Sequence, residues 1–303
     1  MAELRKTVKG SLLENEPMSK HTSYGIGGPA WAYITPKDKN DLHRILQFAM
    51  EYEIPVYFVG SGSNLLVSDD GIDGIVITLG KSFTHLEIHD ENVYAETGVM
   101  LGKMVKECIK RNLSGLESMI GVPGTLGGAL IMNAGAFGGE ISNCLERVEV
   151  MTLSGETKFY YAKEIEFSYR HSTFKEDEIL IASYFKLNEI STEEIQEKRN
   201  SASQGRKANQ PLRFRSAGSV FKNPKPDLAA GYLIDQAGLK GTRSGDAEIS
   251  EKHANFFVNH GQASASDIAK LIRIARKEVE EKFDVMLELE IKTLGFKEDV
   301  FTP

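Results

Sequence analysis

Apolar side chains recur at helical spacing in three stretches of the chain, residues 38–53, 101–112 and 266–282. A repeat close to 3.6 residues places these side chains on one face of a helix, where they pack against a core. The spacing therefore predicts three amphipathic helices. Their apolar positions are Leu42, Ile45, Leu46, Ala49 and Tyr52 in the first, Leu101, Met104, Val105, Cys108 and Ile109 in the second, and Ile268, Leu271, Ile272, Ala275 and Val279 in the third.

Shorter apolar runs bounded by turn residues indicate strands. Residues 85–89 and 92–97 flank one turn and residues 147–153 and 156–162 flank another, so each pair predicts a hairpin. Strands joined by hairpins, rather than by regular crossover helices, indicate the α+β class. Further strands are expected at 56–60, 75–79, 179–187, 255–259 and, from the alternation of apolar and charged residues, 285–295.

A polar segment at residues 191–209 interrupts this pattern and ends at Gln210 and Pro211. Ser191 and Glu194 stand three residues apart, the spacing of a capping box at the start of a helix. We interpret this segment as a candidate domain boundary.

Composition narrows the class of protein. The chain has 303 residues, 41% of them hydrophobic, which is enough for a large buried core. Its formal net charge is -7, and a net acidic chain argues against nucleic-acid binding. The two cysteines, Cys108 and Cys144, argue against a disulfide framework or a zinc site, and no histidine pair has metal-ligand spacing. With no signal peptide or membrane-spanning run visible, we expect a cytoplasmic protein. We further expect a monomer that binds no metal.

The first glycine-rich loop, FVGSGSNLLVSDDG at residues 58–71, follows a predicted strand. Glycines let the backbone approach a ligand closely, so this loop can present N–H groups and small hydroxyls to a diphosphate. It lacks the lysine of a P-loop and does not open a helix in the manner of the dinucleotide fingerprint. An ordinary loop explains the pattern equally well.

The second glycine-rich loop, GVPGTLGGALIMNAGAFGGE at residues 121–140, is apolar for a surface linker. Tight packing between strands is one explanation of its glycines. Together with the first loop and with GIGGPAW at residues 25–31, a large planar cofactor that carries a diphosphate is the better explanation.

Eight segments span nearly the whole chain. They are TSYGIGGPA (22–30), VGSGSNLLVSDDGIDG (59–74), GVPGTLGGALIMNAGAFGGE (121–140), FSYRHSTF (167–174), QPLRFRSAGSVFKNP (210–224), LIDQAGLKG (233–241), SEKHANFFVN (250–259) and LELEIKTLG (287–295). In this order they resemble the family of UDP-N-acetylenolpyruvoylglucosamine reductases.

The resemblance implies an FAD-binding region of the vanillyl-alcohol-oxidase type at residues 1–205, with two lobes that meet near 75–80, and a smaller α+β substrate-binding domain at residues 206–303. It implies NADPH as the hydride donor. The residues that it assigns to the flavin nucleotide are Gly60, Ser61, Gly62, Ser63, Asn64, Leu65, Gly121, Pro123, Gly124, Thr125, Gly127, Gly128, Asn133, Ala134 and Gly135.

Two departures from the family pattern stand out. The family carries an arginine near position 25, where this chain has Gly25, so the resemblance does not carry over a flavin contact from that arginine. The stretch between Arg170 and Ser219 is short and polar, which leaves little room for the tyrosine loop that one group of the family folds over its substrate. The chain therefore resembles the shorter, second type.

The implied reaction reduces the enolpyruvyl ether of UDP-GlcNAc-enolpyruvate to a D-lactyl ether. In this reading Arg170 binds the substrate carboxylate, Ser219 donates a proton, and Glu290 is a protonated acid with a raised pKa. Without the motifs, Arg170 would be read as a surface ion pair and Ser219 as a turn residue. Glu288 and Glu290 share a strand face, so the pattern alone does not separate them.

Tyr169, Lys222 and Asn223 are the residues that the resemblance assigns to the substrate. Arg213, Arg215 and Lys225 extend a basic patch that suits an anionic nucleotide-sugar. Two rival functions stay open at this point. One is a flavin oxidase that acts on a sugar or alcohol with oxygen as acceptor, and the other is a nucleotide-sugar-binding module without activity.

Overall fold

The computed structural model describes residues 1–302, which form two compact units. The first unit comprises Met1–Glu14, Ala32–Ser61 and Gly74–Arg206, and the second comprises Asn15–Trp31, Gly62–Asp73 and Lys207–Pro303. The chain therefore passes from one unit to the other five times. The sequence-based domains divide it once, and because compact units and functional domains are different divisions, those domain bounds stay a prediction.

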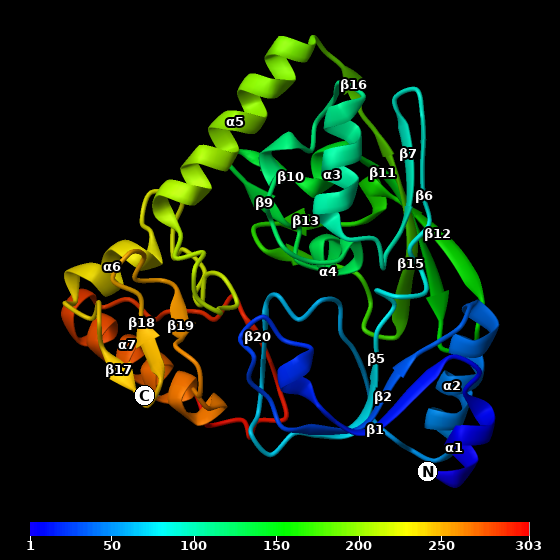
Figure 1. The fold of residues 1–303 in the computed structure, drawn as a ribbon, viewed down its shortest axis with the longest axis horizontal. Coiled ribbons are helices and arrows are strands. Elements are labelled where there is room, and N and C mark those ends of the chain that lie inside the picture. Colours follow the sequence, from blue (N-terminus) through cyan, green and yellow to red (C-terminus); the bar gives the residue numbers. More distant parts are fainter. Residues whose placement is uncertain (303) are drawn as a thin grey trace. The chain divides into compact units, whose positions relative to one another are not determined.

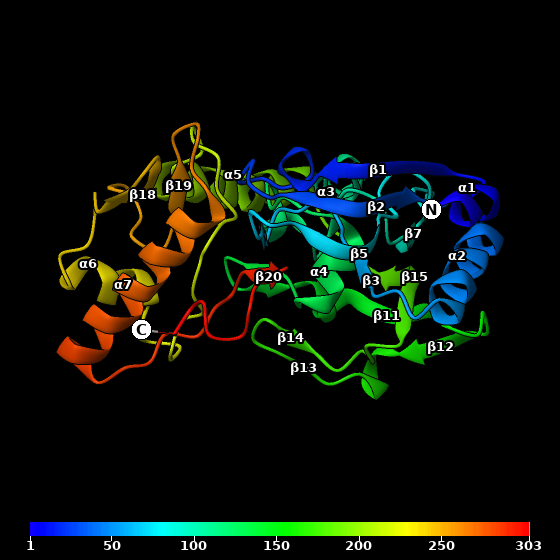
Figure 2. The same ribbon diagram turned by 90° about the horizontal axis from the view of Figure 1, so that it is seen from below.

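An antiparallel five-stranded sheet in the order β12-β11-β15-β7-β6 forms the larger lobe of the first unit (Figure 1). The helices α3 and α4 pack on one face of this sheet, and their apolar side chains share one core with those of β7, β11 and β15 (Figure 2). The strands are β6 (Leu86–His89), β7 (Asn92–Glu96), β11 (Leu145–Thr152), β12 (Thr157–Tyr161) and β15 (Glu178–Lys186), and the helices are α3 (Leu101–Lys110) and α4 (Leu126–Ile131).

A four-stranded sheet in the order β1-β2-β5-β3 builds the other lobe, and most of its residues belong to the first unit. Its parallel β3–β5 pair and the helix α2 confirm the predicted strands at 56–60 and 75–79 and the helix at 38–53. The elements are α1 (Ala2–Thr7), β1 (Ser11–Pro17), β2 (Pro29–Thr35), α2 (Lys39–Glu51), β3 (Val56–Phe58) and β5 (Ile72–Ile77).

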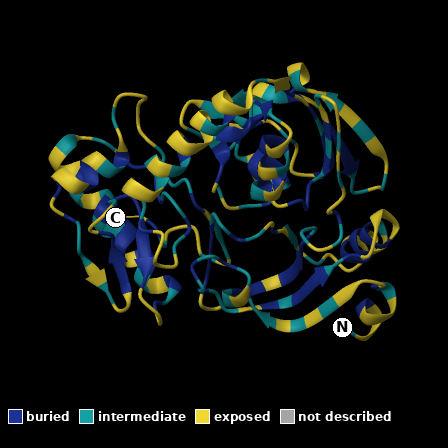
Figure 3. Cartoon of the chain, turned by 45° about the horizontal axis from the view of Figure 1, so that its top comes forward, coloured by how far each residue is buried: buried dark blue, intermediate teal, exposed yellow. Residues whose placement is uncertain are grey.

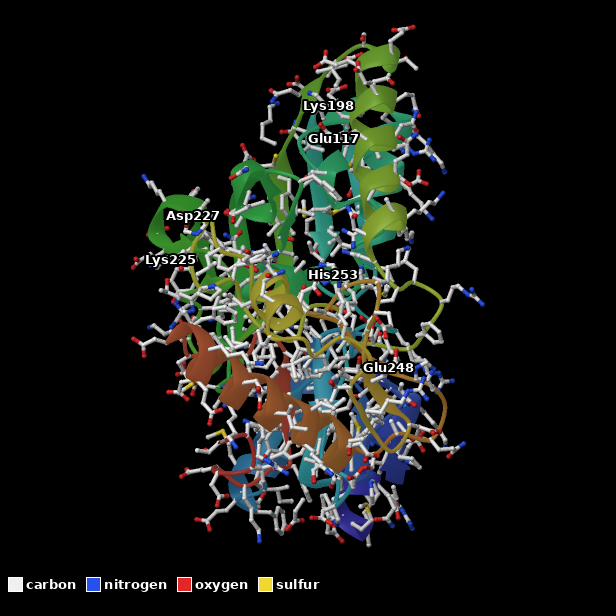
Figure 4. The ribbon with its side chains drawn as sticks, turned by 90° about the vertical axis from the view of Figure 1, so that its left-hand side faces the viewer. Glu117, Lys198, Lys225, Asp227, Glu248 and His253 are labelled. Atoms are coloured by element: carbon white, nitrogen blue, oxygen red, sulfur yellow. The ribbon has the colours of Figure 1, made fainter. Side chains whose placement is uncertain are left out.

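Short elements connect the larger lobe. The segment predicted as a polar boundary is the helix α5, which is mostly exposed and buries only Ile195 and Ala202 (Figure 3). Lys198 on α5 and Glu117 on η2 lie 3.8 Å apart between Nζ and Oε1 (Figure 4). The elements are β8 (Leu113–Ser114), η2 (Glu117–Met119), β9 (Gly135–Ala136), β10 (Gly139–Glu140), η3 (Ile141–Cys144), η4 (Ala162–Glu164), β13 (Phe167–Ser168), β14 (His171–Ser172), β16 (Asn188–Glu189) and α5 (Thr192–Asn209).

The second unit has its own core, in which α7 buries the five apolar positions that its sequence predicted. Ser264 and Asp267 form a capping box at the start of α7, and Asp69 accepts hydrogen bonds from the backbone N–H of Ala265 (2.7 Å) and Ser266 (3.0 Å). The elements are η1 (Met18–Lys20), β4 (Leu65–Val67), α6 (Ala230–Gln236), β17 (Arg243–Ser244), β18 (Ala247–Ile249), β19 (Phe257–Asn259), α7 (Ala265–Phe283) and β20 (Lys292–Leu294).

One predicted strand is wrong in its extent. Residues 285–295 contain the three-residue strand β20, which pairs in parallel with β4, and an isolated bridge at Leu289. The continuous alternation breaks because the backbone changes partner: residues 288–290 bond to residues 220–222, whereas Lys292 bonds to Asn64. The second glycine-rich loop contains the helix α4 and the β9–β10 hairpin.

Candidate active site

Ser219 lies in a backbone segment of the second unit that is held from both sides. On one side Ser219 bridges Phe256, and the N–H of Val220 donates to the carbonyl of Asn255 at 2.9 Å. On the other side the carbonyl of Val220 accepts from the N–H of Glu290 at 2.8 Å. The half-buried Ser219 therefore lies in a segment that is bridged on both sides rather than in a free turn.

Glu288 and Glu290 differ in their surroundings, although the pattern did not separate them. The side chain of Glu288 is 73% exposed and binds Lys222, whose Nζ donates to Oε1. Glu290 is half-buried, and its carbonyl accepts from Nδ2 of Asn64 at 3.0 Å. Its burial, and the pairing of Glu288 with Lys222, favour Glu290 as the carboxyl that acts with Ser219. The hydrogen bond from Asn64 joins the first glycine-rich loop to the backbone of Glu290.

The predicted substrate residues of the second unit follow directly after Ser219. Lys222 is anchored by Glu288, and Oδ1 of Asn223 accepts from the N–H of Ala230 at 3.1 Å, at the start of α6. Arg213 and Arg215 are exposed. A Cβ added to Gly25 would lie 2.1 Å from Nη1 of Arg215, so a guanidinium occupies the space beside the position where the family carries an arginine.

Arg170 lies in the first unit, at the turn of the β13–β14 hairpin. Its backbone adopts φ 56°, an uncommon conformation for a residue with a side chain. Its Nη2 donates to the carbonyl of Gly135 at 3.1 Å, and its Cζ lies 4.9 Å from the centre of the Tyr169 ring. The structure therefore brings Arg170 to the second glycine-rich loop and places Tyr169 against its guanidinium group.

The two glycine-rich loops meet in the first unit. A Cβ added to Gly60 would lie 2.4 Å from Oγ1 of Thr125, so only glycine permits this approach. Ser61 Oγ and Asn133 Oδ1 are buried and have no hydrogen-bond partner among the described residues. Buried polar atoms are normally paired, so these atoms fit a ligand rich in hydrogen-bonding groups. The residues thus suit the diphosphate and ring system of FAD.

Other predicted cofactor residues serve packing inside the protein. A Cβ on Gly62 would lie 1.9 Å from the carbonyl oxygen of His21. The N–H of Gly127 donates to Thr97 at 2.8 Å, and that of Ala134 donates to Ala129 at 2.7 Å. The backbone donors of Gly127 and Ala134 are therefore already used, and the packing explanation of the glycines holds for part of each loop.

Two serines that the sequence did not single out have buried hydroxyls that, like that of Ser61, are unpaired among the described residues. Ser82 Oγ and Ser118 Oγ are buried without a partner among residues 1–302. Ser82 follows Gly80, where an added Cβ would lie 3.6 Å from Cγ2 of Thr125, and Ser118 lies against Gly139. The signal for Ser82 was present, since Gly80 and Ser82 follow a strand just as Gly60 and Ser61 do. Ser118 is found only through the fold.

Two protein families match separate parts of the chain. Residues 30–159 match the FAD binding domain family, and residues 210–294 match the C-terminal domain of UDP-N-acetylenolpyruvoylglucosamine reductase. The fold and the site thus define a flavin-dependent oxidoreductase. Within the described residues, no helix has the length and apolar character needed to span a membrane, and no cluster of side chains suits a metal ion.

Relatives similar over almost their full length narrow the class. The UDP-N-acetylenolpyruvoylglucosamine reductase of Caldanaerobacter subterraneus subsp. tengcongensis is 41% identical over 97% of this chain and 98% of its own length. That of Carboxydothermus hydrogenoformans is 42% identical over 97% of each. The crystal structure of the Thermus caldophilus enzyme superposes with a TM-score of 0.80 at 38% identity and covers 94% of this chain and 99% of that one. The chain belongs to the UDP-N-acetylenolpyruvoylglucosamine reductase family.

Proposed function

We propose that the protein reduces the enolpyruvyl group of UDP-GlcNAc-enolpyruvate to the D-lactyl ether of UDP-N-acetylmuramate, as a monomer in the cytoplasm, with NADPH as reductant. Ser61, Thr125 and Asn133, together with Ser82 and Ser118, would hold the FAD. When bound, FAD supplies the transfer of hydride between NADPH and the enolpyruvyl carbon.

Ser219 would deliver the proton that completes the reduction. A serine hydroxyl is a weak acid, so it must protonate a strongly basic carbon and must be held in line with it. The bonds of Val220 to Asn255 and to Glu290 provide that rigidity. No histidine stands beside Ser219 in the sequence, which argues against a nucleophilic role.

Arg170 and Glu290 would stabilise the charge that develops on the substrate carboxylate. A guanidinium binds a carboxylate through two parallel hydrogen bonds, and a protonated carboxyl adds a third donor. Lys222 and Asn223 would bind the nucleotide diphosphate, with Tyr169 as a further substrate contact.

The observation that carries this proposal is the 2.8 Å hydrogen bond from the N–H of Glu290 to the carbonyl of Val220. It fixes the proposed acid and the proposed proton donor on adjacent backbone segments, in a chain whose family carries out this reduction.

The test separates the two half-reactions. The purified protein should show a flavin spectrum that NADPH bleaches in the absence of oxygen, and UDP-GlcNAc-enolpyruvate should restore it. Ser219→Ala should keep the bleaching and lose nearly all of the restoration, whereas Ser216→Ala, three residues earlier in the same segment, should keep both. A colourless protein that cannot be reconstituted with FAD would end the proposal, and bleaching by a sugar alcohol in place of NADPH would favour an oxidase.

A further inference from the structure

Asn255 makes an unusual set of contacts with the segment that carries Ser219. Its Nδ2 donates to the carbonyl of Phe221 at 2.8 Å, while its Oδ1 accepts from the N–H of the same residue at 2.9 Å. Its main-chain carbonyl accepts from the N–H of Val220 at 2.9 Å. The side chain thus pairs with both backbone groups of Phe221, as a neighbouring strand would.

This amide is almost completely buried, since Asn255 is 3% exposed. Phe221, on which it acts, is fully buried and packs edge-to-face against Phe257 with 6.0 Å between ring centres. Side chains alternate between the two faces of an extended segment, so a slip by one residue here would turn Ser219 to the opposite face. The pairing of Asn255 with Phe221 blocks that slip.

The geometry points to Asn255 as a positioning residue for the proton transfer from Ser219. This inference rests on the proposed function. The amide carries a donor and an acceptor side by side, which matches the two backbone groups of Phe221. An aspartate would place two acceptors there, one of them against the carbonyl of Phe221, and it would restore the donor only when protonated.

The chain offers a matched control four residues further on. Asn259 is also 3% exposed, its Nδ2 donates to the carbonyl of Tyr24 at 2.9 Å, and its Oδ1 accepts from the N–H of Gly261 at 2.7 Å. Both asparagines stabilise the second unit through buried amide bonds, but the side chain of Asn259 bonds to no residue of the 219–221 segment.

The experiment measures both half-reactions in the FAD-loaded full chain for Asn255→Asp, Asn255→Leu and Asn259→Asp. We expect the two Asn255 variants to keep the rate of bleaching by NADPH. At pH 8 we expect them to lose about 100-fold in the rate at which UDP-GlcNAc-enolpyruvate reoxidises the flavin, the order that a displacement near 1 Å can cause. Asn259→Asp should lose stability without this selective loss.

The pH profile supplies a signature that a purely structural role would not give. The reoxidation rate of Asn255→Asp, relative to the parent, should recover as the pH falls from 8 to 5 and the buried carboxyl gains its proton, whereas Asn255→Leu should show no recovery. His253, which lies beside α6 (Figure 4), is an ionisable group next to this segment, and its Nδ1 accepts from the N–H of Asn255. Lys222 and Glu288 are the charged pair next to Phe221. The parent profile over the same range accounts for these groups.

Several results would overturn the inference. Equal losses in the Asn255 and Asn259 variants, parallel losses in both half-reactions, or failure of every Asn255 variant to fold would reduce Asn255 to a structural residue. If the parent itself is bleached by NADPH but not reoxidised by the substrate, the proposed function fails first and this inference falls with it.

Discussion

A buried carboxylate, Asp41, connects two loops of the first unit, and its removal gives a graded test of the structure. Its side chain is fully buried on α2. Oδ1 accepts from the N–H of Lys9 at 2.9 Å, and Oδ2 accepts from the N–H of Gly10 and of Lys37, both at 2.8 Å. Asp41→Ala removes the acceptor of these three N–H donors. Asp41→Asn keeps one acceptor oxygen but replaces the other by an NH2 group, which cannot accept the remaining hydrogen bonds.

The size of the effect follows from the surroundings of the donors. Leaving a buried donor unpaired costs about 1–3 kcal/mol, but Lys9, Gly10 and Lys37 are exposed enough for water to replace the carboxylate in part. We therefore take about 1 kcal/mol for each bond, which gives about 3 kcal/mol for Asp41→Ala and about 1–2 kcal/mol for Asp41→Asn. At roughly 2–4 °C for each kcal/mol, Asp41→Ala should melt about 6–12 °C below the parent.

The sign of the pH dependence is also fixed. Burial alone would raise the pKa of Asp41, but the N–H groups of Lys37, Lys9 and Gly10 together lower it below 3.8. The stabilisation is therefore complete above pH 3.8 and is lost as the pH falls through the lower folded-state pKa. Urea unfolding followed by circular dichroism should show a gap between parent and Asp41→Asn that narrows below pH 3.8.

The exposed Asp73 on β5 serves as control, and Asp73→Ala should stay within about 0.5 kcal/mol of the parent. Equal losses at the two positions, or a gap that widens as the pH falls, would refute the reasoning.

Three more predictions concern the first unit. Gly60→Ala forces a methyl group to within 2.4 Å of Thr125 Oγ1 and should lower FAD retention on gel filtration, whereas Gly102→Ala meets nothing within 4 Å and should retain FAD normally. Glu117 accepts from Gly115 N–H at 2.6 Å, so Glu117→Gln should lower the free energy of unfolding by about 1–3 kcal/mol at pH 7. A melting temperature equal to that of the parent would contradict this. Burial raises the pKa of Cys108 to about 12, so its thiol should resist Ellman's reagent at pH 8 until the protein unfolds, and fast reaction of the native protein would disagree.

The elements that the sequence predicted well are those whose pattern and packing agree. The helices α2, α3 and α7 carry their apolar residues on one face and bury that face. The prediction was wrong for Tyr52, which follows the end of α2 and is 52% exposed. The hairpins β6–β7 and β11–β12 follow alternation interrupted by turn residues. By contrast, α4 lies in a stretch with two glycines, which weaken helix propensity, and tertiary contacts override that local preference.

The sequence predicted candidate site residues but not their arrangement. The motifs indicated Ser219 and the 288–290 segment, yet only the fold shows that Val220 connects them and that Lys222 binds Glu288. Asn255 had no sequence signal of its own, because a buried amide that pairs with backbone groups looks like any other polar residue until its partners are known.

The pairing of β4 with β20 limits how this protein could be divided or recombined. A gene fragment that stops near residue 205 would encode the whole FAD binding match, but it would leave β4 as an unpaired edge and Asn64 without Glu290. Exchange of either half with that of a distant homologue would disrupt the same contacts, the β4–β20 pairing and the Asn64–Glu290 hydrogen bond. Neither half can therefore be inherited as an independent module, and a working chimera would have to carry residues 15–31 and 62–73 together with the C-terminal third.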